Sequence, residues 1–138
     1  MKKVIKPLLY VAVVLGLSVS CKKQDRTTIV FGTVKDNLGK PIVGVDMNLY
    51  REKGILGSRA KLLKTVQTDT KGEYSITTEI PKDYHSGDVL CNFFNDAKFY
   101  GIFDSNKGDI IFNGQATKDC CSVKIGQKNQ YDWILFRK

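Results

Sequence analysis

The sequence predicts an all-β protein, a β-sandwich of about seven or more mainly antiparallel strands. Apolar and polar residues alternate over 43–50 and 73–80, which is typical of strands with one buried and one solvated face. Turn sequences rich in glycine and aspartate recur about every 8 to 12 residues, which favours a sandwich or a barrel. Helical spacing is weak throughout, and 60–63 is the only short helix candidate.

The first expected strand, 28–35, is β-branched and aromatic. It contains Gly32, which indicates a bulge or the close approach of another backbone. After the two alternating segments, the remaining strands are expected at 62–68, 89–94, 99–103, 109–112, 122–125 and 131–137.

Two connecting sequences share one turn pattern. In KDNLGKP (35–41) and TDTKGEY (68–74), an aspartate stands three residues before a glycine. The carboxylate can accept hydrogen bonds from turn amides, and the glycine supplies a positive φ. Both segments are therefore predicted to be tight hairpin connections between neighbouring strands.

The first twenty residues have the composition of an export signal. Three lysines precede an uncharged apolar run of about 12 residues, which is shorter than the roughly 20 that a membrane-spanning helix needs. The run ends at Ser18-Val19-Ser20-Cys21, which resembles the lipobox of bacterial lipoproteins. In that family the cysteine becomes the lipidated N-terminus. The expected division is a signal peptide (1–20), a lipidated tether (21–27) and a single β-sandwich domain (28–138).

This division predicts a place in the bacterial cell envelope. Lipid on Cys21 would anchor the chain to a membrane, and the outer membrane is the expected one, with the domain facing the periplasm or the surface. Each buried CH₂ contributes about 0.8 kcal/mol, so several acyl chains hold the protein in place. A polar tether of this length keeps the domain within roughly 20 Å of the bilayer. An ordinary secretory signal and an uncleaved anchor are the alternatives.

The charge of the mature chain gives no sign of a nucleic-acid partner. Of 22 basic residues, three precede Cys21, which leaves 19 against 14 acidic residues and a net charge of +5. The lysines are scattered among apolar residues, whereas a nucleic-acid patch would cluster them with aromatic residues.

With Cys21 assigned to lipid, three cysteines remain: Cys91, Cys120 and Cys121. An exported protein can form disulfides, so Cys91 is expected to pair with Cys120 or Cys121. Adjacent cysteines on a strand point to opposite faces, so one of the two would stay unpaired. A zinc site completed by His85 is the alternative. The chain has no C-x-x-C or H-x-x-x-H spacing, so no metal site is predicted.

Two segments resemble a known family. GTVKDNLGKPIVGVDMNL (32–49) and TDTKGEYSI (68–76) are similar to the carboxypeptidase regulatory-like domain, which has a transthyretin-like (Ig-like) β-sandwich fold. The similarity covers roughly the first half of the mature chain. It implies a module without catalytic residues of its own, of the kind that accompanies peptidases, outer-membrane receptors and surface lipoproteins. The matching residues are Gly32, Val34, Asp36, Gly39, Pro41, Gly44, Asp69, Gly72 and Tyr74.

No catalytic constellation is evident in the sequence. His85 is the only histidine, and its neighbours Asp83 and Ser86 are too close along the chain to assemble a triad readily. The segment DSNKGD (104–109) begins like a calcium loop but lacks the closing glutamate, so a polar turn is expected. The sequence therefore predicts neither enzyme activity nor a cofactor.

The function expected from the sequence is that of a non-enzymatic envelope lipoprotein that binds a partner or takes part in assembly. The partner would be an envelope protein or a glycan. The loops 51–60 and 81–87 are the expected contact surfaces, with Ile55, Leu56, Tyr84 and His85 exposed in them. Two alternatives remain: a small hydrolase that uses dispersed carboxylates or a thiol, and a small-ligand binder at a dimer interface.

Overall fold

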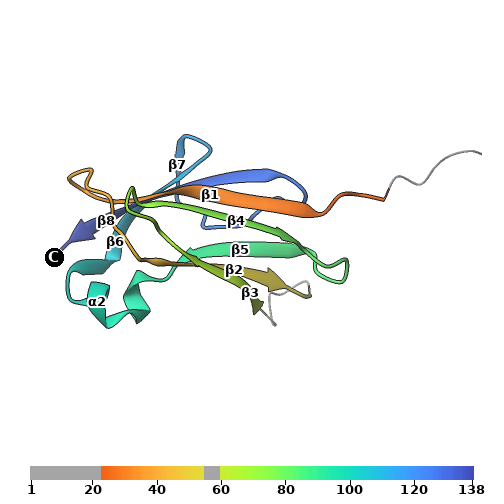
Figure 1. Cartoon of the computed structure of the whole chain (residues 1–138), viewed down its shortest axis with the longest axis horizontal. Coiled ribbons are helices and arrows are strands. Elements are labelled where there is room, and N and C mark those ends of the chain that lie inside the picture. The colour runs from red at the N-terminus through yellow and green to blue at the C-terminus, as the bar shows by residue number, and fades with distance from the viewer. Residues whose placement is uncertain (1–22, 55–59) are drawn as a thin grey trace, which may run out of the picture.

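The computed structural model describes residues 23–54 and 60–138 and confirms the all-β sandwich. A five-stranded sheet in the order β4-β1-β8-β6-β7 packs against a three-stranded sheet in the order β3-β2-β5 (Figure 1). Among the strand pairs of these residues, only β1 and β8 run parallel. The strands are β1 (Thr27–Asp36), β2 (Asp46–Glu52), β3 (Ala60–Gln67), β4 (Glu73–Glu79), β5 (Ser86–Cys91), β6 (Phe103–Phe112), β7 (Gln115–Thr117) and β8 (Lys128–Arg137).

Several local predictions are wrong. The helix candidate 60–63 lies in strand β3, because pairing with β2 overrides its weak helical spacing. The strand expected at 99–103 is instead the end of the short helix α2 (Ala97–Tyr100) and the turn after it, and only Phe103 lies in a strand. The helix α2 follows the 3₁₀ turn η1 (Phe93–Asn95). Asp96 caps α2 by accepting a hydrogen bond from the Lys98 amide at 2.8 Å. The strand expected at 122–125 is reduced to a single bridge between Ser122 and Asp88.

The two aspartate–glycine turns are tight, as predicted, but they are not hairpins. In each turn the glycine amide donates to the aspartate carbonyl at 2.9 Å: Gly39 to Asp36, and Gly72 to Asp69. The first turn begins the connection from β1 to β2, and the second leads from β3 to β4. Both connections therefore pass from one sheet to the other.

The core lies between the two sheets and is formed by alternate residues of their strands. Val30 and Val34 of β1 and Met47 and Leu49 of β2 are fully buried. The C-terminal half adds aromatic side chains, of which Phe93, Phe99, Phe103, Tyr131 and Trp133 are buried. Most of the aromatic residues of this half therefore serve packing.

Several predicted features lie outside the described residues. They are the signal peptide with Cys21, and Ile55 and Leu56 in the 51–60 loop. In the part of the chain that the structure covers, no helix is long and apolar enough to span a bilayer.

Candidate binding site

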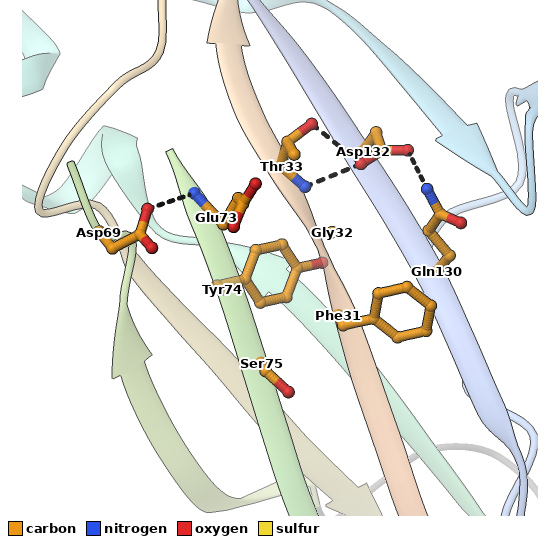
Figure 2. A pocket seen from close by; sticks show the side chains of 9 residues that line it. All are labelled: Phe31, Gly32, Thr33, Asp69, Glu73, Tyr74, Ser75, Gln130 and Asp132. Carbon is orange, nitrogen blue, oxygen red and sulfur yellow. Dashed lines mark hydrogen bonds between the residues drawn. The ribbon is translucent and has the colours of Figure 1, made fainter. Parts of the chain in front are cut away.

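A hollow lies on the outer face of the five-stranded sheet, across β4, β1 and β8 (Figure 2). Its volume is about 540 Å³. It is an open depression that crosses three neighbouring strands. The lining residues are Phe31, Gly32, Thr33, Asp69, Glu73, Tyr74, Ser75, Gln130 and Asp132.

Strand register places the outward-facing side chains of the depression in rows. Phe31 of β1 pairs with Ser75 of β4 on one side and with Gln130 of β8 on the other. The half-buried Phe31 ring is therefore flanked by a hydroxyl and an amide. Thr33 pairs with Glu73, which forms the polar end of the depression.

A carboxylate bridges β1 and β8 where their parallel pairing is interrupted. The paired residues skip from Phe31–Gln130 to Val34–Trp133. Within this gap, Asp132 Oδ1 accepts hydrogen bonds from the Thr33 amide at 2.8 Å and from Thr33 Oγ1 at 2.9 Å. Asp132 Oδ2 accepts one from Gln130 Nε2 at 2.8 Å (Figure 2). The Asp132 carboxylate thus accepts the amide hydrogen bond that a backbone carbonyl of β8 would accept in regular pairing, and it joins β1 to β8 beneath the depression.

Gly32 is the close backbone approach that the sequence predicts. A Cβ atom at this position would overlap the Tyr131 carbonyl oxygen. The Tyr74 hydroxyl donates to the same oxygen at 2.8 Å, from the β4 residue that pairs with Gly32. Burial raises the pKa of Tyr74, so its hydroxyl stays protonated and remains a donor. Because Gly32 has no side chain, the Tyr74 side chain of β4 can reach across β1 to the Tyr131 carbonyl of β8.

The rim of the depression is fixed by a turn. Asp69 Oδ1 accepts hydrogen bonds from the backbone amides of Lys71 at 2.8 Å and Glu73 at 2.9 Å. The side chains of Glu73 and Ser75 are exposed. In the described residues, no hydrogen bond uses the Glu73 carboxylate or the Ser75 hydroxyl. These two groups are available to a ligand, whereas Asp132 and Asp69 are engaged in structural contacts.

The predicted contact loop 81–87 lies elsewhere. The Tyr84 ring is half-buried beneath the Arg51 guanidinium, whose Cζ is 4.2 Å from the ring centroid. His85 is exposed, and its amide donates to the Glu52 carbonyl at 3.3 Å. The Asp83 carboxylate pairs with Lys53 at 3.4 Å. None of these residues lines the depression, and sequence reasoning did not identify the face that does contain it.

The expectation that Cys91 pairs with Cys120 or Cys121 stays a prediction. The Cys91 thiol is buried on β5. Burial raises the pKa of the Cys91 thiol to about 12, so it is not a nucleophile at neutral pH.

The residues considered for metal binding are not gathered into a site. Asp104 Oδ1 accepts the Asn106 amide at 2.9 Å, and Asp104 Oδ2 lies 3.9 Å from the Lys107 ammonium. The calcium-like segment belongs to strand β6 and its irregular pairing with β8. Across 23–54 and 60–138, no three His, Cys, Asp or Glu side chains are grouped as metal ligands.

A second hollow, of about 180 Å³, lies over the three-stranded sheet and is lined in part by Glu52 and Asp88. Burial, together with the nearby charge of Asp88, raises the pKa of Glu52. Ser86 Oγ donates to Glu52 Oε2 at 3.3 Å, and Ser122 Oγ donates to Asp88 Oδ1 at 3.0 Å. The sequence did not suggest this pair, because the two carboxylates meet only through the register of β2 and β5.

No protein-family profile matches the chain, and neither does any curated protein. A 9R-lipoxygenase from Cyanothece PCC8801 is 13% identical, with a TM-score of 0.39, over 80% of this chain and 16% of its own. The dioxygenase domain of a dioxygenase carbohydrate-binding protein fusion from the cellulolytic bacterium Streptomyces sp. SirexAA-E is 13% identical, with a TM-score of 0.40. The match covers 86% of this chain and 84% of that domain. A 3-chlorocatechol 1,2-dioxygenase from Rhodococcus opacus 1CP is 14% identical, with a TM-score of 0.38. The match covers 83% of this chain and 61% of the dioxygenase. The chain thus spans less than a fifth of the lipoxygenase. Similarity at this level informs neither ligand nor chemistry.

Proposed function

We propose that this protein is a non-enzymatic, lipid-anchored binding module of the bacterial envelope, and that the depression over β4, β1 and β8 binds a glycan. The observation that supports the proposal is the row Ser75–Phe31–Gln130, in which an aromatic ring lies between two hydrogen-bonding side chains. The export signal ending at Cys21 and the resemblance to a regulatory-like domain support the location and the absence of catalysis.

A sugar ring matches the chemistry of this row. Its apolar C–H face can pack on the Phe31 ring, whose π face carries partial negative charge and attracts the C–H groups. Its hydroxyls can bond to the Ser75 hydroxyl, the Gln130 amide and the Glu73 carboxylate at the edges of the ring. An open depression also admits one residue of a longer chain without enclosing it.

The test uses the full chain on an array of bacterial and plant oligosaccharides, followed by titration calorimetry with the sugars that bind. Phe31→Ala is expected to weaken binding about tenfold, which corresponds to about 1.4 kcal/mol. Leu62→Ala is the matched control, because Leu62 is 49% exposed on β3, in the other sheet. Failure of all the sugars to bind, or equal affinity in the Phe31 variant, would contradict the glycan site.

The pair of Glu52 and Asp88 supports a second candidate, a hydrolase that uses two neighbouring carboxyl groups. Two carboxyl groups whose surroundings separate their pKa values can act as general acid and general base. Chromogenic esters and glycosides are suitable substrates for this test. Activity that disappears in Glu52→Gln but persists in Glu79→Gln, an exposed carboxylate on β4, would favour the hydrolase over the binding module.

A further inference from the structure

The end of the sandwich from which the tether emerges is held together by Arg26. Its Nε donates to the Ile80 carbonyl at 2.7 Å, and its Nη2 donates to the carbonyls of Tyr84 at 2.7 Å and Pro81 at 3.3 Å. These three bonds join the last residue before β1 to the loop between β4 and β5. The chain is therefore part of the folded domain from Arg26 onward.

The turn 124–128 packs against the same end. The Gly126 amide donates to Thr28 Oγ1 at 3.0 Å, and a Cβ atom at Gly126 would meet the Asp25 carbonyl oxygen. The Gln127 carbonyl accepts the Ile29 amide at 3.1 Å. We use "tethered end" for residues 23–26, 52–53, 80–85 and 124–128, which lie at the side of Figure 1 where the chain enters β1.

Cations outnumber carboxylates at the tethered end. Its carboxylates are Asp25, Glu52 and Asp83, and the exposed Glu79 of β4 adjoins Lys23 and Arg26. Asp25 accepts the Thr27 amide at 2.8 Å, and Asp83 pairs with Lys53. The cations around the end, all exposed except the half-buried Arg26, are Lys23, Arg26, Lys53, Lys82, Lys124 and Lys128.

We infer that the tethered end docks on anionic phospholipid head groups, with the lysines of three separate loops facing the bilayer. This inference rests on the proposed lipid anchor at Cys21. It adds an orientation: the tethered end lies on the membrane, and the turns at the far end of β1 point away from it.

Chain length and charge both favour this orientation. Five residue steps separate Cys21 from Arg26, and at about 3.5 Å each they span at most about 17 Å. An anionic membrane surface attracts basic side chains within about a Debye length, roughly 8 Å at physiological salt. Lys53, Lys82 and Lys124 belong to three different segments that meet at this end, so a single face can place all of them near the phosphates.

The experiment is amine labelling of the lipidated full chain in vesicles. One set of vesicles contains phosphatidylcholine alone, and the other contains an added third of phosphatidylglycerol. Mass spectrometry then reports the acetylation rate of each lysine. We expect Lys53, Lys82, Lys124 and Lys128 to react about fivefold more slowly on the anionic vesicles at low salt, and at equal rates at high salt. The exposed lysines Lys40 and Lys71, at the other end of β1, are internal controls and should not change.

The outcomes separate the two proposals. If the chain remains on the vesicles but its lysines react equally on both lipids, docking is overturned and the anchor stands. If the chain leaves the vesicles and carries no lipid on Cys21, the anchor is overturned and docking with it. A Lys53→Gln, Lys82→Gln, Lys124→Gln variant should remain anchored while protection of Lys128 is lost. Full protection of Lys128 in that variant would contradict a docking face built from these lysines.

Discussion

The two ends of the sandwich stabilise their loops with opposite charges. At the end remote from the tether, carboxylates accept turn amides: Asp36 from Leu38 and Lys40, and Asp69 from Lys71 and Glu73. At the tethered end, the Arg26 guanidinium donates to loop carbonyls instead. The turns of the remote end leave their amides pointing inward, whereas the 80–84 loop presents its carbonyls. Each end thus uses side chains whose charge suits its unpaired backbone groups: carboxylates for the amides of the remote turns, and a guanidinium for the carbonyls of the 80–84 loop.

The two ends also differ in what they expose. Most of the large apolar side chains that are exposed in the described residues, Leu38, Val43, Phe94, Tyr100 and Ile102, belong to the turns and the short helix at the remote end. Both ends expose lysines, but none of these exposed apolar side chains belongs to the tethered end. A basic end without exposed apolar side chains suits a phospholipid surface, whereas an apolar end suits contact with other macromolecules. The comparison therefore agrees with an orientation in which the remote end faces away from the membrane.

The largest effect is expected from Gly72→Ala at the remote end. Gly72 has φ +72°, and a Cβ there would overlap the Val34 carbonyl oxygen, so the turn between β3 and β4 must distort. We expect a loss of about 2–4 kcal/mol in the free energy of unfolding, measured by urea denaturation. Gly101→Ala is the matched control, because nothing lies within 4 Å of its Cβ. It should change stability by less than about 0.5 kcal/mol. Equal losses of stability in the two variants would contradict the requirement for glycine at position 72.

Arg26→Ala tests the tethered end. It removes three hydrogen bonds to buried or half-buried loop carbonyls and should cost about 1–3 kcal/mol. Arg26→Lys keeps the charge but not the forked donor group, so most of the loss should persist. Hydrogen exchange should show faster opening of the 80–84 loop while the remote turns stay protected. Full stability in Arg26→Lys would show that charge alone holds this end.

Asp36→Asn tests the carboxylate at the remote end through pH. Burial alone would raise the pKa of Asp36, but hydrogen bonds from the Lys40 amide, the Arg137 guanidinium and the Leu38 amide lower it below 3.8. A depressed native pKa means that stabilisation is present above pH 3.8 and is lost as the pH falls through the native value. Thermal melts from about pH 6 to about pH 2 should therefore show a smaller decline for the variant. An identical decline would assign the acid sensitivity to other carboxylates.

The smallest effect is expected for maleimide labelling of a thiol in the core between the two ends, where almost no reaction should occur. Cys91 is 2% exposed, and the pKa of its thiol is raised to about 12, so a maleimide at neutral pH should not label it in the folded chain. The same reagent should label it in guanidinium chloride. Rapid labelling of the folded chain would show that one end of the sandwich opens far enough to admit the reagent.

Strand pattern in the sequence predicted much of the fold. Alternation over 73–80 and the content of 28–35 correspond to β4 and β1. The close approach at Gly32 was predicted because glycine in a strand needs a local reason. The exchange of sheets after Asp36 and Asp69 was not predicted, since a tight turn has the same local chemistry whether the next strand continues the same sheet or enters the other.

The depression was not predicted, because no short segment contains it. Its row of Ser75, Phe31 and Gln130 comes from three strands, one of them about a hundred residues away along the chain. A usable signal was present in Gly32, together with an aspartate, Asp132, at an outward-facing position of the last strand. The loops proposed for contact stand out in the sequence only because they lie between expected strands, which is a weaker guide than strand register.

The sequence by itself determined that the chain forms strands, that Asp36 and Asp69 head tight turns, and that an apolar run ends at Cys21, because each of these depends on residues adjacent in the chain. Only the tertiary structure decided which sheet each strand joins, that Cys91 is buried in the core, and that Arg26 binds a loop more than fifty residues away. These outcomes depend on packing and on long-range backbone partners, which local sequence does not specify.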